Sequence, residues 1–425
     1  MVSIDQRTRT DTEREPLDVE DFFDGQLPAL AAEHSYLAVP GALELGVEPF
    51  TFDTPAGAWT VTLADERVLV ERGSQGTAVQ RLDAIELTDI VHDLRTPMTL
   101  LTAGSLTMVS GDLGDALDWW VVLRSLLDGR AVHTRGSVEF HDRDGEPLDL
   151  HRSFGPDDDA AELAHFLAEA GYLHVRDVFT EEEMAEVSND MDAAAGTYAP
   201  DDGRSWWAGT ASGEHLPVRL QYFHEHSERA TALLDDDRFL RIGRLTTDGH
   251  RNRSEGNRVE ALFKPIGVVE GISDVPWHKD CSLGRHSYQC SGLTVGISVT
   301  GADERSGQLA VVAGSHRALV QPAFFRPEWG LPIVDLPTRT GDVTVHCSCT
   351  MHMSHPPHRP GATGDVLRLL DAGVGTRSRP SEPRRAGPGS RAGSPHGQPG
   401  PRLPRLSNDV WVGGRAVPAP SLCSL

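Results

Sequence analysis

The sequence has very little lysine, a deficit of positive charge and no long apolar run. Lysine occurs only at Lys264 and Lys279, and 39 basic residues against 63 acidic ones give a formal net charge of −24. Because phosphate binding needs clustered positive charge, this balance argues against a nucleic-acid partner and against docking on anionic membranes. No stretch approaches the ~18 apolar residues of a membrane helix, and the start lacks the apolar segment of a signal peptide. We expect no membrane insertion.

Cysteine is also scarce, with five residues in a chain of 425. An odd and small number of cysteines does not build a disulfide framework, so a reducing cytoplasm is the expected compartment. A hydrophobic content of 39% with eight tryptophans excludes a disordered chain. At about 100–200 residues per domain, the length predicts two or three domains.

Composition divides the chain, beginning with a polar and acidic segment at residues 1–25 that we expect to be flexible. Residues 26–150 are expected to form an α+β domain. Alternating apolar residues at 59–63 and 68–71 predict a hairpin, and residues 115–127 predict an amphipathic helix that ends at a glycine.

An acidic Gly-Pro linker precedes a second domain at residues 156–370. Asp159 and the Thr180–Glu183 capping box predict two helices there. From Val259 onward, short apolar segments between Gly/Pro turns predict a mainly β sandwich or jelly roll with flanking helices. The expected strands are 259–263, 294–300, 309–312, 342–345 and 366–370. Residues 376–425 are rich in Pro, Arg and Gly and are expected to be mostly disordered.

Candidate metal ligands gather in two motifs. In PWHKD, His278 and Asp280 stand two positions apart, so an extended strand would place imidazole and carboxylate on one face. Such a pair is weak evidence for a metal site by itself, but a third ligand would complete the 2-His-1-carboxylate set of non-haem Fe(II). A downstream segment, GDVTVHCSCTMHMSHP, offers His346, His352 and His355 as that third ligand.

The order of these motifs, HxD, then SGQLAVVAGSHR, then GDVTVHCSCTMHMS, resembles the phytanoyl-CoA dioxygenase family over about residues 156–370. The resemblance implies a double-stranded β-helix, or jelly-roll, fold. It also implies Fe(II) bound by His278, Asp280 and a distal histidine, with 2-oxoglutarate as co-substrate and O2 as oxidant. The distal position of the family falls on His352, which is preferred here over the other two histidines. Related halogenating enzymes replace the carboxylate by a small residue, so Asp280 implies oxygenation.

The distal carboxylate of 2-oxoglutarate needs a cation, and a bidentate arginine suits it best. The family carries an arginine on the strand soon after the distal histidine, where this sequence has Thr363 and Gly364. We therefore expect Arg368 to bind 2-oxoglutarate, with Arg359 as the alternative. Lys264 is a second candidate for contact with 2-oxoglutarate or substrate, although a surface lysine would fit the same pattern.

Segments WTVTL, LTDIV, LTAGSL and SGDLGDAL give the first domain a weaker resemblance to sterol carrier protein 2. That resemblance implies an α+β fold with an apolar tunnel for lipids. The chain is thus expected to be a cytoplasmic Fe(II)- and 2-oxoglutarate-dependent oxygenase that hydroxylates a small organic molecule, as in bacterial specialised metabolism. The alternative is a non-catalytic lipid- or small-ligand-binding protein with a degenerate barrel. Residues 200–260 and 281–289 are expected to line the substrate pocket, and the sequence leaves the oligomeric state open.

Overall fold

The structure, a computed structural model, describes most of the first 375 residues. The described ranges are 17–246, 251–252, 257–271, 275–283, 292–357, 367–375, 409–412 and 415–418. Residues 1–377 form one compact unit and residues 378–425 another. Of the second unit, the described part is the antiparallel hairpin of β19 (Asp409–Val412) and β20 (Arg415–Pro418). The remainder of the tail expected to be disordered lies outside the described residues. No helix in the described ranges is long and apolar enough to cross a membrane.

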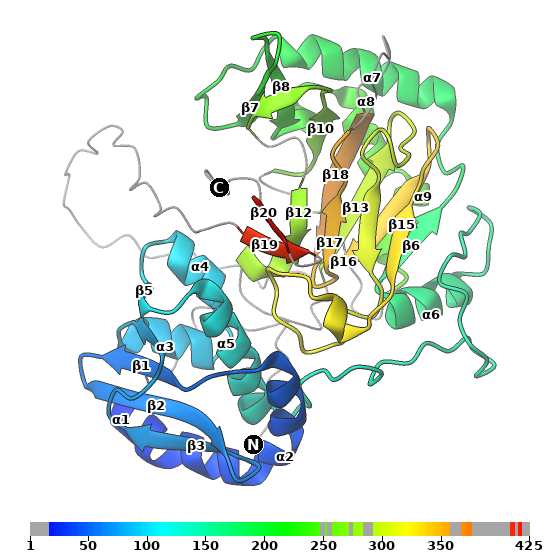
Figure 1. Ribbon diagram of the computed structural model, residues 1–425. Coiled ribbons are helices and arrows are strands. Elements are labelled where there is room, and N and C mark those ends of the chain that lie inside the picture. The colour runs from blue at the N-terminus through cyan, green and yellow to red at the C-terminus, as the bar shows by residue number, and fades with distance from the viewer. Residues whose placement is uncertain are drawn as a thin grey trace, which may run out of the picture. The chain divides into compact units, whose positions relative to one another are not determined.

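The N-terminal part of the first unit is a five-stranded sheet packed against helices (Figure 1). The strand order is β3-β2-β1-β4-β5, in which β1 and β4 are parallel and the other pairs are antiparallel. The strands are β1 (Phe50–Thr54), β2 (Gly57–Ala64), β3 (Arg67–Arg72), β4 (Ala78–Arg81) and β5 (Thr107–Ser110). The helices are α1 (Val19–Asp21), α2 (Leu27–Leu45), α3 (Ala84–Val91), α4 (Pro97–Thr102) and α5 (Leu113–Asp128).

Local sequence explains these elements well. The predicted hairpin is confirmed as β2 and β3, joined by Asp65 and Glu66 with φ of 50° and 59°. Two left-handed residues give the turn whose twist matches that of the strands. The predicted amphipathic helix is confirmed as α5, which begins with a capping box at Asp112 and ends at left-handed Gly129.

The structure differs from the sequence-based expectation near the N-terminus, where residues 19–25 are helical instead of flexible. A π-helical turn, Phe22–Gln26, connects α1 to α2. Phe22 and Phe23 are each 1% exposed, and the Phe23 ring stacks on Trp59 with centroids 4.9 Å apart. Burial of two aromatic rings holds this segment on the sheet, although its composition is mostly polar.

The second part of the first unit contains two sheets that line a common cavity. The larger has the order β11-β7-β8-β10-β18-β13-β16-β6, with β9 paired to β18, and the smaller has the order β12-β17-β14-β15. Strands of the larger sheet are β6 (Tyr172–Val175), β7 (Ser205–Thr210), β8 (His215–Leu220), β9 (Arg251–Asn252), β10 (Glu260–Lys264), β11 (Val268–Glu270), β13 (Leu293–Ser298), β16 (Val343–Cys347) and β18 (Leu367–Gly375). Strands of the smaller sheet are β12 (Val275–His278), β14 (Leu309–Val312), β15 (Ile333–Leu336) and β17 (His352–Ser354).

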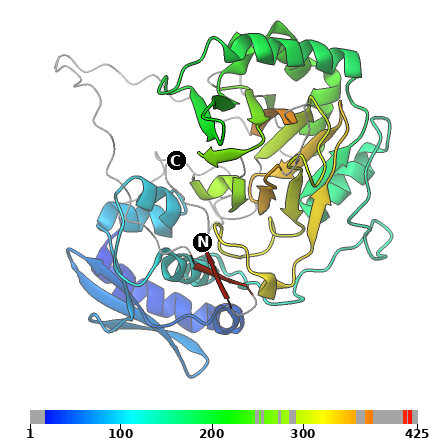
Figure 2. The same ribbon diagram turned by 45° about the horizontal axis from the view of Figure 1, so that its top comes forward.

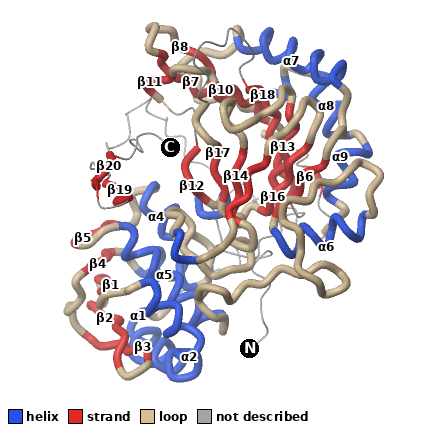
Figure 3. The backbone as a smooth tube through the Cα atoms, turned by 45° about the vertical axis from the view of Figure 1, so that its right-hand side comes forward, coloured by secondary structure: helices blue, strands red, loops and turns tan. Residues whose placement is uncertain are grey.

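Helices flank the larger sheet on the side away from the smaller one (Figures 2 and 3). They are α6 (Ala160–Ala170), α7 (Glu181–Ala195), α8 (Glu228–Asp235) and α9 (Asp237–Gly243). Asp159 caps α6 and a capping box at Thr180 starts α7, as predicted. All strand pairs in both sheets are antiparallel. The arrangement is the mainly β domain with flanking helices expected from the sequence.

The two parts have separate hydrophobic cores that meet at one segment. Most of the first core comes from the N-terminal sheet and helices, but Leu319, 2% exposed, also packs into it. Arg326 bonds Asp118 of α5 at 2.5 Å, and the backbone of His133 donates to the Leu319 carbonyl at 3.1 Å. Independent folding of residues 26–150 and 156–370 stays a prediction.

Candidate metal centre

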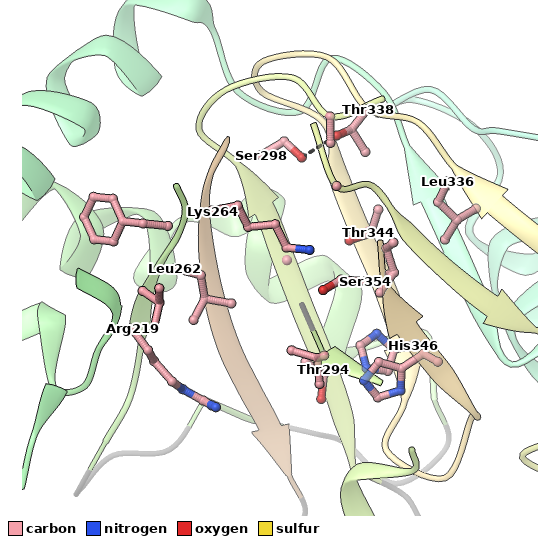
Figure 4. A pocket seen from close by; sticks show the side chains of 18 of the residues that line it. Arg219, Leu262, Lys264, Thr294, Ser298, Leu336, Thr338, Thr344, His346 and Ser354 are labelled. Atoms are coloured by element: carbon pink, nitrogen blue, oxygen red, sulfur yellow. Dashed lines mark hydrogen bonds between the residues drawn. The ribbon is translucent and has the colours of Figure 1, made fainter. Parts of the chain in front are cut away.

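A cavity of about 200 Å³ lies between the two sheets of the β domain (Figure 4). Its hydroxyl-bearing wall residues are Thr294, Ser298, Thr338, Thr344 and Ser354. Its larger apolar wall residues are Trp206, Val218, Leu262, Phe263, Val275, Leu309 and Leu336. Trp206 and Val275 are 37% and 40% exposed, so the cavity meets solvent beside them.

The predicted ligands His278, Asp280 and His352 lie together in this cavity. His278 ends β12 and His352 begins β17, and the two are cross-strand partners. Asp280 follows in the turn Asp280–Leu283. Its Oδ1 lies 3.4 Å from Nε2 of His278 and 3.5 Å from Nε2 of His352. One ligand atom from each of the three residues lies within 4.8 Å of the others. Such spacing suits a single small cation.

Backbone hydrogen bonds fix how both histidines present their rings. Nδ1 of His278 lies 2.8 Å from the Pro276 carbonyl, and Nδ1 of His352 lies 2.9 Å from the Thr350 carbonyl. A carbonyl oxygen can only accept, so Nδ1 carries a proton in each ring, and in the neutral ring Nε2 then keeps a lone pair. Two imidazole lone pairs and one carboxylate oxygen therefore converge, which is the donor set of a metal site.

The electrostatics of the group agree with cation binding. Burial alone would raise the pKa of Asp280, but the neighbouring His352, His278 and His346 lower it well below its usual value. Burial opposes charge on His278 as well, yet the neighbouring Asp280 raises its pKa. The pKa of His352 is well below normal, because its ring is buried beside two other histidines. A buried neutral His352 and an ionised Asp280 are the protonation states that a metal ion requires.

The two rival histidines occupy different positions. His355 lies outside the triad, and its Nε2 is 2.9 Å from Oδ1 of Asp335. His346 does reach the site: its ring is 6% exposed, and its Nε2 lies 3.4 Å from Oδ2 of Asp280. It contributes to the cavity wall without joining the group of three that could hold a metal.

Of the residues expected to bind 2-oxoglutarate, Lys264 lines the cavity. Its side chain extends from β10 toward Ser354 and Thr344, and its ammonium donates to the His355 carbonyl at 2.7 Å (Figure 4). Lys264 is 9% exposed, so it is no surface lysine. Arg368 lies on β18 opposite Phe263 as a strand residue, and its side chain is outside what the structure describes. Arg359 and most of 281–289 are also outside the described residues.

Sequence reasoning missed three polar residues of the cavity. Thr294 donates its hydroxyl to Oδ2 of Asp280 at 2.8 Å. The Ser354 hydroxyl is buried and has no hydrogen-bond partner within the described ranges. Arg219 lies near the exposed end, paired with Glu260 and stacked 4.6 Å over Trp206. Strand alternation could have marked Ser354, which stands two positions after His352 on the same face; the other two depend on strand pairing.

A scan against protein-family models matches residues 167–360 to phytanoyl-CoA dioxygenase (PhyH). The match spans both candidate ligand motifs and most of the two sheets. A search of curated proteins found no match.

Solved structures with a similar fold include SnoN, AviO1 and EctD. The α-ketoglutarate-dependent epimerase SnoN from nogalamycin biosynthesis is 20% identical, with 51% of this chain and 80% of that chain covered and a TM-score of 0.40. AviO1 from Streptomyces viridochromogenes Tue57 is 19% identical, with 53% and 98% covered and a TM-score of 0.41. EctD from S. alaskensis, crystallised with 2-oxoglutarate and 5-hydroxyectoine, is 19% identical, with 57% and 84% covered and a TM-score of 0.41.

Proposed function

We propose that this chain is an Fe(II)- and 2-oxoglutarate-dependent oxygenase that hydroxylates a small organic molecule. The observation that carries the proposal is the convergence of two backbone-fixed Nε2 lone pairs with Oδ1 of Asp280 in a cavity between two sheets. The match of residues 167–360 to the phytanoyl-CoA dioxygenase family model supports it independently of the geometry.

The donor set favours Fe(II) over other resident ions. Two imidazoles and one carboxylate match the facial triad of non-haem Fe(II), which leaves positions open for co-substrate and O2. His278, Asp280 and His352 would hold the ion. Bound iron would supply O2 activation coupled to oxidative decarboxylation of 2-oxoglutarate, with succinate and CO2 as products. The chain itself contributes ligand orientation and a largely apolar wall that limits water.

The Lys264 end of the cavity fits the distal carboxylate of 2-oxoglutarate. There the ammonium of Lys264, 9% exposed, lies on the same side as the buried and unpartnered Ser354 hydroxyl (Figure 4). A charged donor and a hydroxyl together suit a carboxylate, and low solvent exposure strengthens both contacts. Arg368, on the strand next to Lys264, is the second proposed cation.

The apolar part of the cavity wall is left for the organic substrate. Trp206 and Val275 are partly exposed, and Val218 and Leu262 add apolar surface. Such a wall selects a molecule with an apolar face and not a highly charged one. Asp280 argues against halogenation, because a carboxylate in that position would occupy the site that a halide needs, and hydroxylation is the reaction proposed here.

The proposal is tested with purified full-length protein and its His278→Ala variant. We expect the wild type to bind one Fe(II) under anaerobic conditions and to release succinate from 2-oxoglutarate once O2 is admitted. The variant should do neither, while circular dichroism shows that it is folded. If the wild type binds apolar small molecules without iron and never yields succinate, the ligand-binding alternative replaces the oxygenase. The sterol-carrier-like role of residues 26–150 and a cytoplasmic location stay predictions.

A further inference from the structure

The two oxygens of the Asp280 carboxylate have different surroundings. Oδ1 faces Nε2 of His278 at 3.4 Å and Nε2 of His352 at 3.5 Å. Oδ2 accepts from the Thr294 hydroxyl at 2.8 Å and lies 3.4 Å from Nε2 of His346. One oxygen thus belongs to the candidate metal site, and the other belongs to a pair of polar side chains behind it.

Those two side chains come from one rigid surface. Thr294 on β13 and His346 on β16 are direct cross-strand partners in the larger sheet. Cross-strand partners point to the same face with Cβ atoms about 5 Å apart, so both can reach a single carboxylate oxygen. Asp280 approaches from the turn after β12, which belongs to the smaller sheet. The contact therefore links the ligand-bearing turn to the opposite sheet.

His346 differs from the two ligand histidines in how its ring is held. Its ring is 6% exposed and packs against His352 with centroids 4.0 Å apart. Within the described ranges no backbone carbonyl bonds a ring nitrogen of His346, whereas a backbone carbonyl fixes Nδ1 in both proposed ligand histidines. No bond at Nδ1 to a described residue therefore fixes the tautomer of His346, and Nε2 is able to carry the proton. A proton on Nε2 places a donor directly beside Oδ2.

We propose that Thr294 and His346 form a clamp that holds Oδ2 of Asp280, so that the carboxylate offers Oδ1 alone to the metal. This inference rests on the proposed function and makes both clamp members positioning residues, with His346 not a ligand. A carboxylate free to rotate can bind through both oxygens and occupy a further coordination position. Holding Oδ2 keeps that position open for co-substrate or O2.

The consequence is measurable with metal alone. Partners that orient a metal ligand typically change metal affinity by about 10–100-fold when they are removed. Thr294→Val keeps the shape and loses the hydroxyl, so Co(II) affinity should fall within that range, and Thr294→Ser should restore it. Thr344→Val is the matched control, because Thr344 lies on β16 in the same cavity wall and, among the described residues, has no hydrogen bond to Asp280. We expect its Co(II) affinity to equal that of the wild type.

The visible absorption of bound Co(II) supplies a readout that a merely structural role would not move. If released Oδ2 joins the metal, the coordination number rises and the d–d bands of the Thr294→Val protein weaken and shift. The bands of Thr294→Ser and of the Thr344→Val control should match those of the wild type. Identical bands and affinity in Thr294→Val and wild type would overturn the clamp.

Variants of the second clamp residue keep the test valid if Thr294→Val does not fold. His346→Gln retains an N–H donor and should bind Co(II) nearly as the wild type does, whereas His346→Phe should show the 10–100-fold loss. Complete loss in both, equal to that of His352→Ala, would identify His346 as a ligand and refute the clamp. Absence of Co(II) binding by the wild type would instead refute the proposed metal site, so the two failures are distinguishable.

Discussion

Replacing Lys264 by methionine tests the proposed 2-oxoglutarate site most directly. Methionine keeps most of the apolar stem, so packing on β10 changes little while the ammonium is lost. Lys264 is 9% exposed, and water screens its charge weakly. A hydrogen bond to a charged group contributes about 1.5–3 kcal/mol, which corresponds to about a 10- to 150-fold loss of 2-oxoglutarate affinity.

The assay is calorimetric titration of 2-oxoglutarate into the anaerobic Fe(II)-loaded protein. Fe(II) affinity, measured first, serves as the internal control, because Lys264 lies at the Ser354 side of the cavity and not among the ligands. It should stay within about threefold of wild type, well under the 10-fold loss expected of a residue that supports the metal. Arg368→Ala, titrated in parallel, separates the two proposed cations.

One result would refute the assignment of Lys264. If Lys264→Met binds 2-oxoglutarate as tightly as wild type while Arg368→Ala binds it weakly, the strand arginine holds the distal carboxylate. Lys264 would then only tie β10 to the His355 carbonyl, a contact of 2.7 Å. A loss in both variants would mean that the two cations share the carboxylate.

Three further predictions concern the ligands, a glycine and the domain boundary. His355→Ala should retain iron binding and succinate release, which His278→Ala loses; inactivity of the first in a folded protein would contradict the ligand assignment. Gly307→Ala should lower both melting temperature and 2-oxoglutarate affinity, because Gly307 has φ of +95° and an added Cβ would lie 2.7 Å from Cδ of Lys264; unchanged values would show that the loop yields. A protein beginning at Pro156 should bind iron but melt at a lower temperature, since Leu319 loses its packing partners; loss of all binding would mean one shared core.

Local signals explain why much of the fold was predictable. Caps at Asp112, Asp159 and Thr180 mark helix starts by hydrogen bonds that involve neighbouring residues only. Strand alternation likewise located the hairpin of β2 and β3. The helical segment at residues 19–25 was missed because its order depends on the Phe23–Trp59 stack, a contact between residues far apart in sequence.

The candidate site, like the fold, was predictable where a local motif marks its residues. His278, Asp280 and His352 carry a motif, and the structure brings them together. Thr294 carries none, because its contact with Asp280 arises from the way β13 lies behind the turn after β12. Residue spacing within one segment does not show which residues of the opposite sheet lie beside it. Residues such as Thr294 can therefore be identified only when the strand order is known.

The three histidines of the segment from β16 to β17 show what finally separates ligand from neighbour. In the sequence, residue type alone does not distinguish His346, His352 and His355 as metal ligands. In the structure, the first lies beside Oδ2 of Asp280, the second has Nδ1 bound to a carbonyl two residues earlier, and the third faces Asp335. The second arrangement places an Nε2 lone pair 3.5 Å from Oδ1, where one cation could bind both atoms. Because His278 has the same bond to the carbonyl two residues before it, the two proposed ligand rings present Nε2 in the same way to one cation.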